Sequence, residues 1–150
     1  MVKTTDLAYI AGFFEGEGCV LIQRRKTSKT VHKILHFLHI EISQVDVKPL
    51  LKIQKVFGGR IYYDKRLRIN KWIITNTNAA NFLKKIDKFL ITKKKESYTA
   101  IKFSKLIRKN GKSGRGHGIT NLEFKKREAL YWKLRELKDI KYGRKNRNSR

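Results

Sequence analysis

Residues 7–18 read LAYIAGFFEGEG, which is eight apolar or small residues followed by two glutamates separated by one glycine. The hydroxyl and carboxyl side chains of residues 4–6 favour a helix start just before this stretch. Apolar side chains then recur at the spacing of an α-helix, at Leu7, Ile10, Ala11 and Phe14. Gly16 and Gly18 interrupt the pattern. The stretch therefore predicts a helix with a buried face that ends at the two acids.

A second face of this helix carries small residues. Ala8, Gly12 and Gly16 recur at intervals of four, so they lie on one side, where they allow another helix to approach backbone to backbone. A helix that is apolar on two sides needs two partners. Since no later segment of the chain repeats residues 7–18, the second partner is expected to be the same helix of another subunit. The pattern predicts a two-fold symmetric homodimer.

Charge is the strongest global signal. The 150 residues include 37 Lys and Arg against 12 Asp and Glu, a formal net charge of +25. A folded domain this basic favours a polyanionic partner, and nucleic acid more than a membrane surface, because no amphipathic helix with exposed aromatic residues is evident. A ribosomal-type RNA-binding protein would share this composition, but would not explain residues 7–18.

Composition also indicates the compartment. No apolar run approaches the length of a membrane span, and the N-terminus lacks the pattern of a signal peptide. The single cysteine, Cys19, has no internal partner for a disulfide, which suits a reducing environment. We expect an intracellular protein with access to the genome, in the cytoplasm of a prokaryote or in an organelle, and no membrane partner.

The rest of the chain alternates strand and helix patterns. We expect strands at 19–26, 31–43, 60–65 and 68–75, and helices at 45–59, from 76 or 77 to 90, at about 94–107 and at 121–138. The order αββαββα predicts an α+β fold, in which a curved antiparallel four-stranded sheet has helices on one face. Residues 1–138 are expected to form one domain with a flexible basic loop at 108–118, and residues 139–150 a basic tail.

This combination resembles the LAGLIDADG homing endonucleases of the single-motif type. Residues 10–18 stand at the nine positions of the family signature, and αββαββα is the core of that family, so the resemblance covers roughly residues 5–100. It implies an activity: site-specific, metal-dependent cleavage of both strands of a long, near-palindromic DNA target. It also implies an intron-encoded homodimer and products with short 3′ overhangs.

The resemblance assigns roles to the two acids. Glu17 stands where the family has its metal ligand, joined by the backbone carbonyl of Gly16, and Glu15 is expected to be structural, holding the turn. The signature has aspartate where this chain has glutamate. In a dimer two Glu17 carboxylates would meet at helix ends that already carry partial negative charge, and a divalent cation removes that conflict. We expect Mg²⁺, with Mn²⁺ as a substitute.

Three further residues resemble the groups that organise water and phosphate in this family. They are Gln44, just after the second strand, Lys48, about one helical turn later, and Lys93 in the segment FLITKKKES. With Glu17 they make up the predicted catalytic set. An ordinary helix-entry role for Gln44 and a solvated surface lysine at position 93 are the structural alternatives.

Alternation along the strands predicts the surface that contacts DNA. Leu38, Ile40, Ile42, Trp72 and Ile74 are expected to point inward. The residues expected to face DNA are Leu21, Gln23, Arg25, Lys33, Leu35, Phe37, His39, Glu41, Tyr63, Lys65, Arg66 and Lys71, with Arg24 and Lys26 near its backbone. In the strand alternation Arg68 falls on the same side as Trp72 and Ile74, which point inward. It is therefore expected to face DNA only if it belongs to the turn. Arg and Lys side chains suit guanine, Gln suits adenine, and Glu41 could accept from cytosine.

Two other interpretations accompany these predictions. His32, His36 and His39 invite a metal site, but on a strand His39 faces opposite to the other two, so structural or phosphate-contacting roles are favoured. The alternative function is a nucleic-acid binder on the same fold that does not cleave, either an RNA maturase or a DNA-binding regulator. The paired acids favour the enzyme, because a simple binder has no use for carboxylates facing phosphate.

Overall fold

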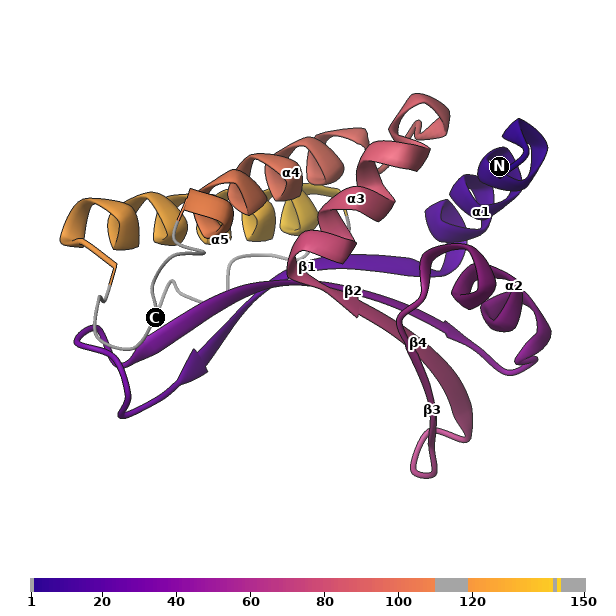
Figure 1. Cartoon of the computed structure of the whole chain (residues 1–150), viewed down its shortest axis with the longest axis horizontal. Helices are drawn as coiled ribbons and strands as arrows, with labels where there is room; N and C mark the ends of the chain where they lie inside the picture. Colours follow the sequence, from indigo (N-terminus) through magenta and orange to yellow (C-terminus); the bar gives the residue numbers. More distant parts are fainter. Residues whose placement is uncertain (1, 110–118, 142, 144–150) are drawn as a thin grey trace.

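The computed structural model describes residues 2–109, 119–141 and 143, and its elements follow the predicted order (Figure 1). They are α1 (Thr4–Glu17), β1 (Gly18–Lys26), β2 (Ile34–Gln44), α2 (Lys48–Phe57), β3 (Arg60–Asp64), β4 (Ile69–Thr75), α3 (Asn76–Ile86), the 3₁₀ helix η1 (Asp87–Phe89), α4 (Lys94–Lys109) and α5 (Asn121–Lys141). The α+β fold, with αββαββα followed by appended helices, is therefore confirmed.

The four strands form one antiparallel sheet in the order β1-β2-β4-β3. Ile42 of β2 pairs with Gly18 of β1 on one side and with Trp72 of β4 on the other, so the two hairpins join along their central strands. Figure 1 shows the sheet curved like an arch, with the helices on its convex side and its concave side uncovered. This arrangement leaves one face of the sheet free for a partner.

Four aromatic rings hold the helices to the sheet. The ring of Phe82 in α3 lies 5.3 Å from that of Phe14 in α1, 4.8 Å from that of Phe57 in α2 and 5.2 Å from that of Trp72 in β4. Phe82, Phe14 and Trp72 are fully buried. The helix-facing residues Leu38, Ile40, Ile42, Trp72 and Ile74 are all buried, as alternation predicted.

Two element boundaries differ from the expectation. α2 begins at Lys48 rather than near residue 45, and the Asp46 carboxylate accepts a hydrogen bond of 2.9 Å from the Lys48 N–H. α3 ends at Ile86 and gives way to η1 before residue 90.

Two of the predicted segments are only partly described. α5 continues through residues 139–141, into the stretch expected to be a tail. Residues 110–118 of the expected loop, and residues 142 and 144–150 of the expected tail, lie outside the described residues. No helix within the described ranges has the length and apolarity needed to cross a membrane.

Replacing Phe82 with alanine is expected to lower the free energy of unfolding by about 3–5 kcal/mol, because the substitution removes a ring that touches three others and leaves a cavity. Urea unfolding followed by circular dichroism measures this loss. Tyr98→Ala is the matched control, since Tyr98 is 68% exposed on α4, and it should change the unfolding free energy by less than about 0.5 kcal/mol. Equal effects of the two substitutions would contradict this assignment of the core.

Candidate functional site

The acidic end of α1 is exposed. Glu17 is the last residue of the helix, and Gly18 continues directly into β1 with an extended backbone. Gly16 and Glu17 are both solvent-exposed, so the Glu17 carboxylate and the Gly16 backbone are available at this end. Within the described part of the chain no three Asp, Glu, His or Cys side chains form a metal cluster. Carboxylate and carbonyl oxygens such as these are ligands that Mg²⁺ prefers.

Glu15 has a different environment from Glu17. Its carboxylate accepts hydrogen bonds from the backbone N–H groups of Ile91 (3.2 Å), Thr92 (2.8 Å) and Lys93 (2.9 Å), and from the Thr92 hydroxyl (2.5 Å). These residues immediately precede α4, whose N-terminal end carries partial positive charge. Partial burial works to raise the pKa of Glu15, but the hydrogen bonds from Thr92, Lys93 and Ile91 outweigh it and lower the pKa to about 2.

Lys93 lies beside Glu15 at the C-terminal end of α1. Its side chain is buried, with 3% of the residue exposed, and its ammonium donates a hydrogen bond to the backbone carbonyl of Glu15. Carbonyls at a helix C-terminus lack partners within the helix, and a lysine is well suited to satisfy one. Burial and the nearby Lys141 lower the pKa of Lys93, although Glu96 and Glu15 act in the opposite direction. The structure thus excludes the alternative that Lys93 is a solvated surface lysine.

Gln44 is the last residue of β2, and Lys48 is the first residue of α2. Because Gly18 pairs with Ile42, the last residues of β2, including Gln44, lie at the same end of the sheet as Glu17. The Gln44 side-chain oxygen accepts a 2.8 Å hydrogen bond from the Val45 N–H, and Lys48 is exposed at the start of α2. Among the described residues no hydrogen bond or ion pair joins either side chain to Glu17.

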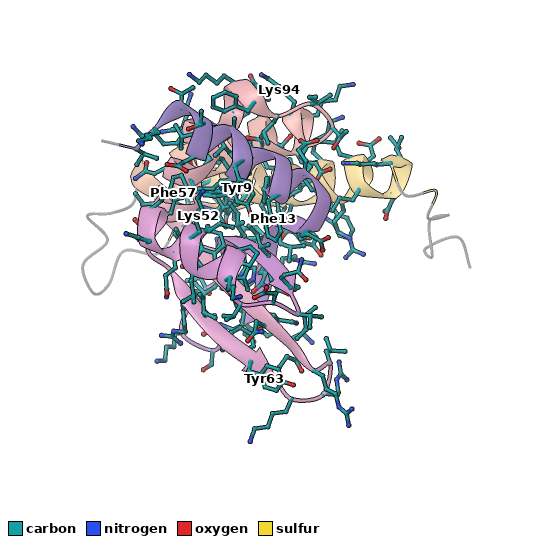
Figure 2. All side chains as sticks on the ribbon, turned by 90° about the vertical axis from the view of Figure 1, so that its right-hand side faces the viewer. Tyr9, Phe13, Lys52, Phe57, Tyr63 and Lys94 are labelled. Atoms are coloured by element: carbon teal, nitrogen blue, oxygen red, sulfur yellow. The ribbon has the colours of Figure 1, made fainter. Side chains whose placement is uncertain are left out.

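The outer side of α1 is uncovered (Figure 2). Ala8, Gly12 and Gly16 are exposed, and a Cβ added at Gly12 or Gly16 would meet no described atom within 4 Å. Tyr9, which is 45% exposed, stacks on Phe13 with ring centroids 6.2 Å apart. Small and aromatic side chains therefore form an apolar face beside the exposed acid.

The uncovered face of the sheet carries most of the side chains predicted to face DNA. Pairs in the register share a face, and the pairs Leu21–His39, Gln23–Phe37 and Arg25–Leu35 lie opposite the buried pairs Val20–Ile40 and Ile22–Leu38. The Arg25 guanidinium lies 5.5 Å from the centre of the Phe37 ring. Lys71, across from Ser43, extends this face onto the second hairpin.

Glu41 and Lys71 form an ion-pair network on that face. Lys71 Nζ lies 3.2 Å from Glu41 and 3.3 Å from Asp64, and His39 Nε2 lies 3.5 Å from Glu41. Partial burial acts to lower the pKa of Lys71, but Glu41 and Asp64 outweigh it and raise the pKa. Burial lowers the pKa of His39 despite Glu41, which favours the neutral ring. These side chains are held in place before any partner arrives.

The remaining basic candidates lie at the two ends of the arch. The β3–β4 turn contains Lys65, Arg66 and Arg68. Arg68 was expected to face DNA only if it belonged to a turn, and this condition is met. Lys26 and Lys33 flank the β1–β2 turn, where Thr27 N–H donates to the Lys33 carbonyl at 3.0 Å.

One predicted contact, Tyr63, is wrong about the face, and Arg24, which was expected near the DNA backbone, has a partner within the chain. Arg24 points to the helix side, where its Nε lies 3.0 Å from Glu128 of α5. Tyr63 pairs with Asn70. It therefore lies on the same face of the sheet as the pair Ile61–Trp72, which is the face that the helices cover. Figure 2 places Tyr63 near the free end of the second hairpin.

Sequence reasoning missed two residues of β3 that do lie on the uncovered face. Tyr62 pairs with Lys71, and Arg60 pairs with Ile73, whose parity matches that of Lys71. The sequence alone could not identify these two residues, because the face of each β3 residue depends on the number of residues in the turn between β3 and β4.

Two of the three histidines serve the interface with α5. His36 Nε2 lies 2.5 Å from Glu128, and burial lowers the pKa of His36 although Glu128 acts to raise it. The ring of His32 stacks on Phe124 with centroids 4.2 Å apart. His39 lies on the opposite face, as predicted, so the three do not converge on a metal.

Comparisons with known proteins agree with this fold. A family model described as LAGLIDADG endonuclease matches residues 10–105. The fold is similar to that of the homing endonuclease I-CvuI in complex with the I-CreI target, with a TM-score of 0.78 and 17% identity over 99% of this chain and 88% of that chain. It is also similar to the archaeal intron-encoded homing endonuclease I-Vdi141I complexed with DNA, with a TM-score of 0.76 and 21% identity over 89% of this chain and 84% of that one.

A third solved structure differs in length. The meganuclease I-SmaMI bound to uncleaveable DNA gives a TM-score of 0.72 and 19% identity, but the match covers 86% of this chain and only 45% of that chain. At these identities the likeness concerns the fold. No curated protein sequence matches the chain.

Replacing Glu15 with glutamine is expected to lower the free energy of unfolding at pH 7 by about 1.5–3 kcal/mol, the scale of hydrogen bonds to a charged group. Since the pKa of Glu15 falls from 4.5 to about 2 on folding, its contribution is present above pH 4.5 and is lost as the pH falls toward 2. Chemical unfolding at a series of pH values should show the difference between the variant and the wild type shrinking over that range.

Glu136→Gln provides the control for this measurement, because Glu136 is an exposed acid on α5 with a single ion pair to Lys133. It should change stability little at any pH. A Glu15→Gln variant as stable as Glu136→Gln at pH 7 would show that Glu15 does not anchor α4.

Proposed function

The chain belongs to the LAGLIDADG endonuclease family, and we propose that within it this protein is a homing endonuclease that makes a double-strand break in a long, near-palindromic DNA target. The observation that carries the proposal is the pair of environments of the two motif acids. The Glu15 carboxylate accepts hydrogen bonds from the residues at the start of α4, whereas Glu17 is exposed at the end of an uncovered helix face. A chain that only bound nucleic acid would gain nothing from an exposed carboxylate near phosphate.

The active form is proposed to be a homodimer that pairs α1 with α1. The exposed face of α1 consists of small and apolar residues with open space above Gly12 and Gly16, which suits close approach of a second helix. The match to I-SmaMI covers only 45% of that chain, so that chain has room for a second copy of the fold. Pairing about a two-fold axis would bring two Glu17 side chains together and join two sheets into one long surface.

The donor set fits a divalent cation that prefers oxygen. The Glu17 carboxylate and the Gly16 carbonyl from each subunit would hold Mg²⁺, or Mn²⁺ in its place, together with phosphate oxygens of the DNA. When bound, the cation supplies Lewis-acid neutralisation of the phosphate charge during hydrolysis. Without it, two carboxylates and two helix C-termini would repel one another and the phosphate.

Three residues of the chain are proposed to support the reaction. Lys93 places a positive charge at the end of α1, beside the acids, where it offsets the negative helix terminus and charge developing on the phosphate. Gln44, at the same end of the sheet, would orient the attacking water through its side-chain amide. Lys48, exposed at the start of α2, would contribute a second positive charge once DNA is bound.

DNA is proposed to lie along the uncovered face of the sheet. Gln23, Arg25, Glu41 and Lys71 would present hydrogen-bonding groups to base edges in the major groove. The Glu41–Lys71 ion pair fixes both side chains in advance, so it would favour specificity over strength of binding. The basic residues at the two turns are placed to contact phosphates, and affinity should fall as salt increases.

Replacing Glu17 with glutamine should abolish cleavage while leaving DNA binding intact. Duplexes cut by the wild type would be selected from a randomised library with Mg²⁺, and the selected site would then be tested with each variant. The wild type should cut at a two-fold symmetric site, and Glu17→Gln should be slower by about a hundredfold or more, the scale of losing one group that stabilises transition-state charge. Glu136→Gln should cut normally.

The same selection separates the alternative functions. Tight binding to a defined duplex, with no cleavage by the wild type in Mg²⁺ or Mn²⁺, would instead indicate a regulator or a maturase on this fold. Affinity that does not change when the metal is chelated would point the same way.

Replacing Gly12 with leucine should prevent dimerisation without unfolding the subunit. Leucine favours a helix, and a Cβ at position 12 meets no described atom within 4 Å, so we expect the added side chain to obstruct a partner helix rather than the fold of the subunit. We expect at least a tenfold weaker dimer by analytical ultracentrifugation, with a parallel loss of cleavage. Ala129→Leu adds bulk to an exposed position of α5 and should leave the dimer unchanged.

A further inference from the structure

A groove lies where the edge strand β1 meets α5, on the helix side of the sheet's margin. It encloses about 440 Å³, which is within the range of pockets that hold a small organic ligand. Residues 19–24 of β1 form one wall, and the α5 wall is lined by Tyr131, Leu134, Arg135, Lys138 and Asp139. β1 has a neighbour on one side only, so its outer margin is open to this groove. We call it the β1–α5 groove.

Two arginines that line this groove also contact two aromatic rings, Tyr131 in its α5 wall and Trp132, the next residue of α5. The Arg24 guanidinium lies 5.2 Å from the centre of the Tyr131 ring and 5.9 Å from that of Trp132. The Arg135 guanidinium lies 5.8 Å and 5.7 Å from the same two rings. Arg135 also donates a 2.9 Å hydrogen bond to the Tyr131 hydroxyl. The cluster is held in place by contacts of its own.

Trp132 is the unusual member of this cluster. It is 46% exposed, whereas the other tryptophan of the chain, Trp72, is fully buried. A large exposed aromatic side chain flanked by guanidinium groups is a surface on which a planar base stacks, with π-stacking on the indole and cation–π contact to arginine. Bases in a duplex already stack on one another, so such a surface selects an unpaired base.

The other groups of the groove suit the sugar and phosphate of the same nucleotide. Lys138, whose Nζ lies 2.9 Å from the Cys19 sulfur, and Arg135 supply positive charge for a phosphate. Asp139 supplies a carboxylate that accepts a hydrogen bond from a hydroxyl. A 2′-hydroxyl is the group that distinguishes RNA from DNA, so this acceptor favours RNA.

From these observations we propose that the β1–α5 groove, together with the neighbouring Trp132, binds single-stranded RNA, with an unpaired base stacked on Trp132. This site is separate from the proposed DNA surface, because Arg24 points to the helix side of the sheet while Gln23 and Arg25 point to the uncovered side. The inference does not depend on cleavage. A dimer joined through α1 would carry two such grooves.

The test is a fluorescence titration of the full-length protein with a 12-nucleotide single-stranded RNA of mixed sequence, in the presence of excess duplex DNA. Stacking on Trp132 should quench tryptophan emission. Trp132→Leu, which keeps an apolar side chain but has no ring, should lose this quenching and bind RNA about tenfold more weakly by fluorescence anisotropy of labelled RNA, the scale of losing one stacked base. Its affinity for duplex DNA should not change.

Controls separate stacking from other effects. Tyr98→Leu removes an exposed aromatic residue outside the groove and should bind RNA like the wild type. Asp139→Asn should reduce the preference for RNA over DNA of the same sequence, and Glu17→Gln should bind RNA normally whatever its effect on cleavage. Displacement of the RNA by duplex DNA, equal affinity of the wild type for the single-stranded DNA, or unchanged RNA affinity in Trp132→Leu would each overturn the proposal.

Discussion

The arrangement of the acidic corner depends on one carboxylate placed against the start of a helix. Glu15 accepts three backbone N–H groups and a hydroxyl from the residues that precede α4, where the helix dipole favours negative charge. This contact joins residues 76 or more positions apart in the chain. It also carries Lys93 to the end of α1, where the lysine satisfies the carbonyl of Glu15 itself. The position of Glu17 relative to a buried positive charge follows from that bond.

The same corner extends to the last helix. Lys141 Nζ lies 3.2 Å from the Thr92 hydroxyl and 3.5 Å from Glu96, so α5 is tied to the turn that Glu15 holds. Further along, α5 is tied to the sheet by Glu128, which contacts both Arg24 and His36. A helix beyond the matched residues 10–105 thus braces both the proposed catalytic corner and the edge of the sheet.

The two faces of the sheet accommodate charge differently. With a net charge of +25, the folded chain repels itself, and binding a polyanion relieves that repulsion. The helix side of the sheet carries little charge, because apolar side chains fill the space between β2 and the helices. The uncovered side keeps polar groups in register but pairs Lys71 with Glu41 and Asp64, so its charge is organised in advance.

By itself the sequence determined the element order, the two environments of a strand and the helix that ends in two acids. These follow from local rules: apolar periodicity, alternation along strands and glycines that interrupt a helix. The alternation predicted for β2 was correct, because in this long strand every second residue is buried against the helices. Alternation failed at Tyr63, because the parity of β3 depends on how many residues the turn to β4 contains. Alternation already puts Arg24 on the side of Val20 and Ile22, but its partner there, Glu128, is more than a hundred residues away and no local pattern reveals it. Only the tertiary structure decided that Lys93 is buried against α1, that Glu15 anchors α4 and that Arg24 belongs to a groove with α5. In each case a long-range contact, which no local pattern encodes, sets the environment of the side chain.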